Sequence, residues 1–573
     1  MTAQEPAAES RDRKLPDKRI LVLVALIIGL GLALRLWGIG WSLPDARHPL
    51  ATYHPDESIN LNAARAADIP HGQFDIQFYN YGAFYFYLVS FAQTFGRGWG
   101  LIPTTPNLSI PQGAQPTAAQ WATLAPENAA LFLTGRIVTA LLGAATIPLL
   151  FALGRRLYGT RVGLTAALLY AIAPLAVQHA HFLTVDVPAT FFVTLALLWA
   201  ARLWKQPDWK NVIWAGVWAG LAAATKYNTG CVLLAPLVAL ALARPSGERA
   251  NHLPLKLAAL IGVTAAAFLI ACPGPWLDWN AFWNGTYPGS GVRYELFEHA
   301  RTGHELLFVD TGPGWWYHLT ASLRYGLGEP LLLLALAGFV FACIRRTPQD
   351  GILLSFFLLY YFTTSLSAVR FARYMIPLLP VLCLWAARLL AEPFPQRRLR
   401  QALAAIGTLV ALYTLLLAFS FNLSMTGRDP RDQAADYLER NAPQGASIAF
   451  ARIPWFTSPP LSPLFGLPAA PQRAKAAAET TRFTLRIPPV EWDTSVLSPP
   501  PDYVVLSNLE TVNAVTRLHL PGPVRFVRSI PANDTRLVFA PPTLLGLPPN
   551  REGVGVPEDL LYTRPLLTLY RKP

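Results

Sequence analysis

Residues 151–186 read FALGRRLYGTRVGLTAALLYAIAPLAVQHAHFLTVD, and this stretch contains the pattern on which the fold prediction rests. One apolar run ends in the basic pair Arg155 and Arg156, and a second begins at Val162. The second run gives way at residues 179–186 to a short polar segment with two histidines and one aspartate. Apolar runs that alternate with short connections of contrasting charge are typical of helices that cross a membrane back and forth.

The composition of the whole chain agrees with a polytopic membrane protein. Of its 573 residues, 53% are hydrophobic and 14% are charged, whereas soluble domains carry about 25% charged residues. The net charge of +13 would suggest a nucleic-acid partner if the basic residues gathered on one soluble face. They gather instead between apolar runs, so we expect no nucleic-acid partner.

Apolar stretches predict about eleven transmembrane helices. The stretches lie at residues 20–37, 130–153, 162–177, 187–203, 212–224, 229–243, 255–271, 331–344, 352–366, 374–390 and 402–421. A further aromatic run, residues 78–95, is predicted to form a membrane-surface or re-entrant helix. Counting it as a span would place the basic connections outside the cell, against the positive-inside rule.

The basic residues predict the orientation. If the N-terminus is cytoplasmic, every second connection is cytoplasmic and basic, as the positive-inside rule requires. These connections contain Arg155, Arg156, Arg161, Arg202, Lys205, Lys210, Arg244, Arg249, Lys256, Arg345, Arg346, Arg388, Arg397, Arg398 and Arg400. We therefore predict an integral plasma (inner) membrane protein with a cytoplasmic tail at residues 1–19 and a membrane domain at residues 20–424.

The composition changes at about residue 425, after which no long apolar run occurs. Residues 432–441 predict a helix, and residues 447–451, 503–507, 524–529 and 536–539 predict strands. The predicted fold class is thus mainly α, a polytopic helical membrane protein with a small extracytoplasmic α/β domain at residues 425–573.

Three carboxylates in the predicted outer connections are candidate catalytic residues. Asp56 and Glu57 follow His54 in the first outer connection, and Asp186 lies in the second. A carboxylate close to a span requires a compensating cation, hydroxyl donor or metal, because desolvation disfavours its charge. The alternative interpretation is a solvated turn or a helix cap.

Basic residues are scarce on the predicted outer side, which makes each of them a candidate ligand for an anion. Lys226 lies in a hairpin between two spans, and Arg370, Arg373 and Tyr374 lie at another outer span edge. An arginine fork suits a phosphate, and a lysine adds a point charge. The alternative is that these side chains reach toward lipid headgroups.

Three histidines raise the hypothesis of a divalent metal. His54, His179 and His181 lie beside the acidic residues in the first two outer connections, and histidine and aspartate are common metal ligands. The alternative is that they orient the carboxylates. No cofactor is otherwise indicated.

Taken in order, these features resemble the glycosyltransferase superfamily C, in particular the protein O-mannosyltransferase and aminoarabinose transferase branch. The resemblance rests on the basic N-terminus, residues 54–57 (HPDE), the aromatic run 79–95, the span end 154–159 (GRRLYG) and the loop that reaches Asp186. The chain departs from the oligosaccharyltransferases of the superfamily, since Trp315 and Trp316 are followed by Tyr317 where those enzymes have aspartate.

The resemblance implies a hexosyl- or pentosyltransferase that moves a sugar from a polyprenyl-phosphate donor to a protein, lipid or polysaccharide acceptor, with inversion. It implies that Asp56 is the general base, that Glu57 completes its motif and that Asp186 shapes the site. Lys226 and Arg373 resemble the phosphate-binding positions. The rival interpretation is a polytopic secondary transporter or lipid flippase, for which the charges would line a path through the membrane.

Overall fold

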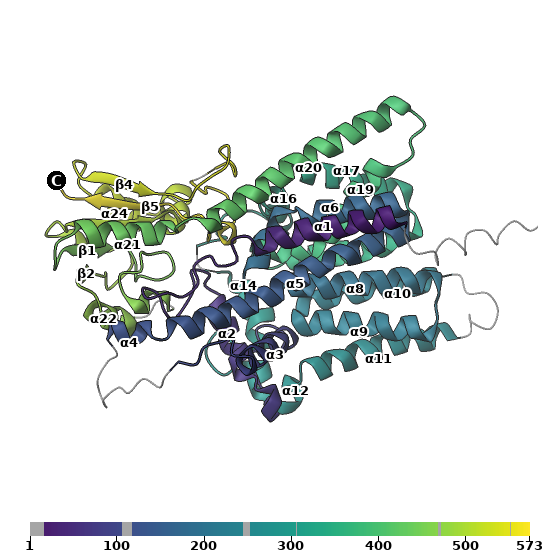
Figure 1. The fold of residues 1–573 in the computed structure, drawn as a ribbon, viewed down its shortest axis with the longest axis horizontal. Helices are drawn as coiled ribbons and strands as arrows, with labels where there is room; N and C mark the ends of the chain where they lie inside the picture. The colour runs from purple at the N-terminus through teal and green to yellow at the C-terminus, as the bar shows by residue number, and fades with distance from the viewer. Residues whose placement is uncertain (1–16, 106–116, 244–251, 305, 468–470, 551) are drawn as a thin grey trace, which may run out of the picture.

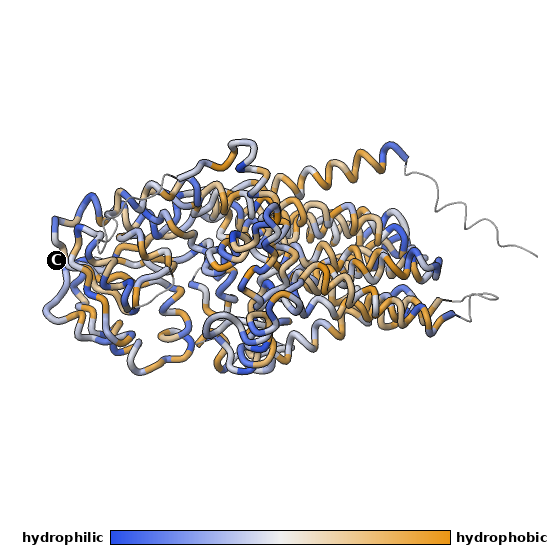
Figure 2. Tube along the Cα trace, turned by 90° about the horizontal axis from the view of Figure 1, so that it is seen from below, coloured by the Kyte–Doolittle hydropathy of each residue, from blue (hydrophilic) through white to orange (hydrophobic). Residues whose placement is uncertain are grey.

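The computed structural model describes residues 17–105, 117–243, 252–304, 306–467, 471–550 and 552–573. It shows a bundle of long helices next to a smaller domain with a β-sheet (Figure 1). Hydrophobic residues dominate the bundle, whereas hydrophobic and hydrophilic residues are mixed in the rest of the molecule (Figure 2). Most of the predicted tail, and Arg244 and Arg249, lie outside the described residues.

Six helices within the described ranges are long and apolar enough to cross a membrane. A seventh is added if the bent pair α6 and α7 counts as one span. The chain is therefore an integral membrane protein with multiple spans. The six are built from α1 (Lys18–Leu36), α5 (Ala125–Tyr158), α8 (Asp186–Lys205), α11 (Leu253–Ala271), η7 (Ala372–Leu378) with α19 (Leu379–Ala391), and α20 (Arg397–Thr426).

The other stretches that the sequence predicts as spans are also helical. They form α6 (Thr160–Ala171), α7 (Pro174–Gln178), α9 (Trp209–Thr225), η3 (Tyr227–Leu233), α10 (Leu234–Leu242), α17 (Glu329–Arg345) and α18 (Pro348–Ser365). The prediction of a mainly helical, polytopic chain is confirmed. The finer count of about eleven spans and the orientation stay predictions.

Short elements gather between the bundle and the sheet domain (Figure 1). The helix α3 has 15 residues, which corresponds to about 22 Å and is shorter than the hydrocarbon core of about 30 Å. The short elements are α2 (Glu57–Ala66), η1 (Ile69–His71), α3 (Phe84–Gly98), α4 (Ala118–Ala122), η2 (His179–His181), α12 (Gly274–Leu277), α13 (Trp279–Asn284), η5 (Tyr294–His299), α14 (Ala300–Thr302), α15 (Gly314–Tyr317), η6 (His318–Leu323) and α16 (Arg324–Leu327).

The C-terminal part contains a five-stranded mixed sheet in the order β2-β1-β3-β5-β4. The strands β2, β1 and β3 are parallel, and β5 runs antiparallel to both β3 and β4. The bounds are β1 (Ser447–Phe450), β2 (Thr484–Arg486), β3 (Tyr503–Ser507), β4 (Thr535–Phe539) and β5 (Leu567–Arg571), with helices α21 (Pro430–Asn441), α22 (Pro471–Glu479), α23 (Asn508–Thr511) and α24 (Pro521–Arg528) and the short turns η8 (Pro463–Gly466), η9 (Thr494–Leu497), η10 (Val512–Arg517) and η11 (Glu558–Leu560).

The sequence prediction was wrong at residues 524–529, which form most of α24 and not a strand. Pro521 occupies the first helical turn, where its missing N–H costs no hydrogen bond. Phe526 is fully buried in a cluster with Ala449 and Val504 of the sheet. Covering the sheet with one apolar helix face outweighs the strand preference of the valines and the phenylalanine.

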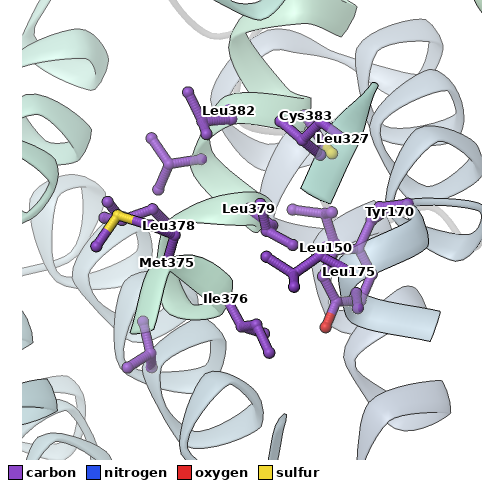
Figure 3. Packing of buried hydrophobic residues seen from close by; sticks show 14 of the residues in the cluster. Leu150, Tyr170, Leu175, Leu327, Met375, Ile376, Leu378, Leu379, Leu382 and Cys383 are labelled. Carbon is purple, nitrogen blue, oxygen red and sulfur yellow. The ribbon is translucent and has the colours of Figure 1, made fainter. Parts of the chain in front are cut away.

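The centre of the bundle is packed around η7 and α19. Met375, Ile376 and Leu379 are completely buried, and they lie in one cluster with Leu150 of α5 and Tyr170 of α6 (Figure 3). Because residues 375–379 are fixed in this core, the backbone of the two preceding residues, Arg373 and Tyr374, is held in place.

The break between α6 and α7 is stabilised by a buried arginine. The two helices meet at an angle of 59°, and Pro174 at the start of α7 cannot donate a backbone hydrogen bond. Arg35 of α1 is fully buried and donates to the carbonyls of Ala171, at 3.0 Å, and Gly31, at 2.9 Å. The guanidinium thus replaces helical hydrogen bonds that the break removes.

Two glycines allow α5 and α6 to pack closely. A Cβ atom on Gly163 would lie 2.5 Å from the carbonyl oxygen of Phe151, and one on Gly154 would lie 2.8 Å from the Cα of Gly163. Both contacts involve backbone that cannot move aside without shifting a helix. In contrast, a Cβ on Gly262 of α11 would meet nothing within 4 Å.

We expect Gly163→Ala to destabilise the bundle by about 1–3 kcal/mol, because the added methyl group overpacks a helix contact. Gly262→Ala is the matched control and should leave the unfolding temperature in detergent unchanged or slightly raised. Thermal unfolding of the two variants, followed by tryptophan fluorescence, checks this. Equal unfolding temperatures would show that α5 and α6 do not approach as described.

Candidate active site

Asp56 is held at the start of α2 by a buried ion pair of its neighbour. Glu57 and Arg136 are both completely buried, and Arg136 donates to the two carboxylate oxygens at 2.8 and 2.6 Å. Glu57 also accepts from the Thr52 hydroxyl at 2.5 Å and from the Leu183 backbone N–H at 2.8 Å. Burial would raise the pKa of Glu57, and the nearby guanidinium more than offsets this, so the pKa lies below its ordinary value.

This network ties the start of α2 and the segment between η2 and α8 to the bundle. Arg136 also donates to the carbonyls of Ile39 and Trp41, at 2.9 and 2.6 Å. Because Leu183 binds the same carboxylate, the segment that carries Asp186 is fixed to the segment that carries Asp56. Both carboxylate oxygens of Glu57 face this buried network, and its predicted catalytic role stays a prediction.

Arg373 stands at the centre of a cluster of carboxylates. Its side chain is 4% exposed, and its Nη2 lies 2.8 Å from Asp56 Oδ2. The guanidinium is also 3.9 Å from Asp186 Oδ2 and 3.8 Å from Asp559 Oδ2. Residues far apart in the sequence are therefore brought together around one cation.

Lys226 extends the cluster. It follows the last residue of α9, and its Nζ lies 2.5 Å from Asp186 Oδ1. The same ammonium lies 4.1 Å from the centre of the Tyr374 ring, within cation–π range. Asp186 thus joins both cations, so that Asp56, Arg373, Asp186 and Lys226 form a continuous chain of charges.

Of the two carboxylates in this row of charges, Asp56 is the more accessible, with 28% of its side chain exposed against 3% for Asp186. Partial burial would raise the pKa of Asp56, but Arg373, helped by His54, His304 and Lys226, holds it below its ordinary value. Asp56 is therefore ionised at neutral pH.

Asp559 is a site residue that the sequence analysis missed. It lies in η11 of the C-terminal part and is completely buried. Its two carboxylate oxygens accept the backbone N–H groups of Ala372, at 3.1 Å, and Arg373, at 2.9 Å. Burial nevertheless raises the pKa of Asp559. Asp559 directly follows Glu558, but this acidic pair lies far from any predicted span, so the sequence analysis did not connect it with the site.

A cavity of about 510 Å³ opens beside Lys226 and Tyr374. Asn80, Glu295 and Arg301 contribute polar groups to its wall. Cys231 of η3 and Thr363 of α18 also line it, so two helices of the bundle form part of the wall. Leu366, which also lines it, is 85% exposed. The cavity therefore connects the charged cluster with the outer surface of the bundle.

The three candidate metal-ligating histidines have other contacts. His54 packs against the rings of Phe182 and Tyr562, with centroids 4.5 and 5.1 Å away, and burial lowers its pKa to about 4. The two ring nitrogens of His181 lie 2.9 and 3.1 Å from the carbonyls of Val177 and Trp37.

His179 points elsewhere, since its Nε2 lies 3.8 Å from Asp559. Within the described residues, no group of three or more His, Cys, Asp and Glu side chains could hold a metal ion. The three histidines therefore do not form, with the other described residues, the metal site that the sequence raised as a hypothesis.

Arg370 does not join the carboxylate cluster. Its Nη1 donates to the Thr311 hydroxyl at 2.8 Å and to the Gly312 carbonyl at 2.6 Å. These contacts fasten the residues just before η7 to the segment before α15. Of the predicted basic residues, Lys226 and Arg373 are thus brought together with Asp56 and Asp186, and Arg370 supports their segment.

Residues 130–276 match the family model described as dolichyl-phosphate-mannose-protein mannosyltransferase. The match confirms, over this segment, the resemblance to the O-mannosyltransferase branch of the glycosyltransferase superfamily C. The segment includes Asp186 and Lys226. No curated protein sequence matches the chain.

Several solved structures are similar to this one. ArnT from Cupriavidus metallidurans, bound to undecaprenyl phosphate, is 13% identical with a TM-score of 0.47, over 96% of this chain and 98% of that one. The oligosaccharyltransferase AglB from Archaeoglobus fulgidus, in complex with an inhibitory peptide and a dolichol-phosphate, is 14% identical with a TM-score of 0.49, over 86% and 70%. The Pmt1-Pmt2 complex of S. cerevisiae is 18% identical with a TM-score of 0.34, over 46% and 35%.

We expect Glu57→Ala to cost about 3–5 kcal/mol of folding free energy, because it leaves the Arg136 guanidinium buried without its anion. Glu127→Ala is the control, since Glu127 pairs with the exposed Arg97 and should cost less than about 1 kcal/mol. The measurement is thermal unfolding in detergent. A Glu57→Ala protein that unfolds like the wild type but has lost its activity would place Glu57 in the chemistry.

Proposed function

We propose that the protein is a membrane glycosyltransferase that transfers a sugar from a polyprenyl-phosphate donor to an extracytoplasmic acceptor, with inversion. The observation that carries the proposal is the chain of charges Asp56, Arg373, Asp186 and Lys226 beside a cavity that reaches the outer surface of the bundle. The family match of residues 130–276 supports the donor class. The sugar and the acceptor are left open by this proposal.

Lys226 and Arg373 would bind the donor phosphate. Breaking the bond between the sugar and the phosphate leaves negative charge on the phosphate oxygens, and preformed cations in a partly water-excluded site stabilise it. Lys226 and Tyr374 line the cavity, and Arg373 precedes Tyr374 in the chain and lies 3.9 Å from Asp186, the partner of Lys226. The lipid part of the donor would approach from the apolar surface near Leu366.

Asp56 would be the general base on the acceptor hydroxyl. In the structure its basicity is suppressed by Arg373, 2.8 Å away. A donor phosphate that draws hydrogen bonds from Arg373 would weaken this pair and raise the pKa of Asp56. Asp56 would then be a stronger base when the donor is bound, so that it removes the acceptor proton only in a site that holds the donor.

Asp186 and Asp559 would act as positioning residues. Asp186 holds Lys226 and lies near Arg373, and Asp559 fixes the backbone of Arg373. With all groups ionised, three carboxylates exceed the two cations by one charge. Burial raises the pKa of Asp559, and a donor phosphate would compete with these carboxylates for Arg373 and Lys226.

The arrangement of charges favours the enzyme over the rival transporter. A transporter would place its substrate-binding charges near the middle of the membrane. Here the acids and bases from α2, α8, α9 and η7 converge at the end of the bundle next to the sheet domain (Figure 1). We propose no step that uses a metal.

We expect Asp56→Asn to lower transfer by about 10²–10⁴-fold, since the acceptor proton loses its base. The assay uses membrane vesicles with a labelled polyprenyl-phosphate mannose or aminoarabinose donor and follows label in the envelope fraction. Asp68→Asn in the same connection is the control, because Asp68 pairs with His71 on the surface. Transfer by Asp56→Asn at the wild-type rate would exclude Asp56 as the base.

The pH profile of kcat/KM tests the pairing with Arg373. Because the pKa of Asp56 lies below its ordinary value, the acid limb of the wild-type profile should fall below about pH 4. Arg373→Met removes the opposing charge, so burial raises the pKa of Asp56 and the limb should move to higher pH. Arg370→Met, which leaves this pair intact, should not move the limb; an unmoved limb in Arg373→Met would contradict the pairing.

A further inference from the structure

A second, larger cavity lies at the opposite end of the bundle from the charged cluster. It has a volume of about 930 Å³ and is enclosed by α1, α6, α19 and α20. Leucines supply much of its wall, among them Leu30, Leu168, Leu390 and Leu412. Two arginines, Arg161 at the start of α6 and Arg400 at the start of α20, also line it.

The cavity exists because α20 diverges from the bundle. Figure 1 shows the helix leaning away from α6 and α19 toward its N-terminal end, and residues 397–409 contain no buried residue. The face of α20 that lines the cavity carries small residues with helical spacing at Ala404, Gly407, Thr408 and Ala411. Ala404, Thr408 and Ala411 are too small to fill the space beside them, whereas Gly407 lets Leu390 pack closely, since a Cβ there would lie 2.9 Å from Leu390 Cδ1.

The polar end of the cavity carries an excess of positive charge. Glu392 also lines it, but its carboxylate is paired with Arg345 at 2.8 Å. The Nη1 of Arg400 donates to the Phe394 carbonyl at 2.6 Å, which holds the guanidinium in place while its remaining N–H groups stay free to bind another acceptor. Arg161 and Arg400 thus give this end of the cavity a positive charge that suits an anion.

The length of the cavity matches one leaflet of a bilayer. From Arg161 to Ile172, the residues of α6 that line it extend about 16 Å along the helix, at 1.5 Å per residue. This is close to half of the hydrocarbon core of about 30 Å. The break after Ala171 ends the cavity near the middle of the bundle.

We propose that this cavity binds one anionic diacyl phospholipid of the leaflet at the basic end of the bundle. The phosphate lies against Arg161 and Arg400, and the acyl chains fill the apolar space between α6 and α20. The length favours a phospholipid over a polyprenyl chain, which is longer than one leaflet. The site goes beyond the proposed transfer reaction and does not depend on it.

The test is native mass spectrometry of the delipidated full chain in detergent, titrated with phosphatidylglycerol or phosphatidylcholine. We expect the tightest phosphatidylglycerol site to be roughly tenfold or more stronger than the phosphatidylcholine site, because two basic side chains face the headgroup. Arg161→Gln with Arg400→Gln should remove this preference, whereas Arg398→Gln, on the same helix end but outside the lining, should keep it.

Ala404→Trp fills the cavity and should abolish the tight site for both lipids. Because Ala404 is exposed, the variant should still fold, and its unfolding temperature checks this. Three results would overturn the proposal: equal binding of the two lipids, an unchanged preference in the double variant, or displacement of phosphatidylglycerol by an equal concentration of undecaprenyl phosphate. Asp56→Asn, which tests the proposed transfer, should bind phosphatidylglycerol like the wild type.

Discussion

The contact between Arg373 and its three carboxylate neighbours determines the arrangement of the candidate site. A guanidinium that is nearly removed from water requires anions around it, since an isolated buried charge is strongly disfavoured. Asp56, Asp186 and Asp559 supply them from α2, α8 and η11. Each of these elements must therefore reach its place for the arginine to be tolerated, and the packed core below η7 (Figure 3) fixes where that place is.

A second buried pair acts in support of the first. Glu57 and Arg136 connect the start of α2, the segment before α8 and α5. Such a pair adds little net stability compared with apolar residues of the same size. It nevertheless fixes which segments meet, because the Glu57 carboxylate accepts hydrogen bonds from Arg136, Thr52 and the Leu183 backbone. The position of Asp56, one residue away, follows from that geometry.

Much of the bundle could be predicted from the sequence, because apolar runs and basic connections are local signals. The predicted stretches are all helical, and Asp56, Asp186, Lys226 and Arg373 do meet. Contacts between distant parts of the chain could not be predicted. The pairing of Glu57 with Arg136 and the contact of Asp559 with the Arg373 backbone have no local signal. Residues 524–528 form a helix because the sheet beside them needs an apolar cover.

Asp559 and Asp56 come from nearly opposite ends of the chain and meet at the same arginine. During synthesis the early segments emerge long before the last, so Arg373 has part of its anionic surroundings missing until the C-terminal part has folded against the bundle. A nascent chain that ends before η11 would contain the helices of the bundle but would lack Asp559 beside Arg373. The surroundings of Arg373 are therefore complete only after η11 has been synthesised and has packed against η7.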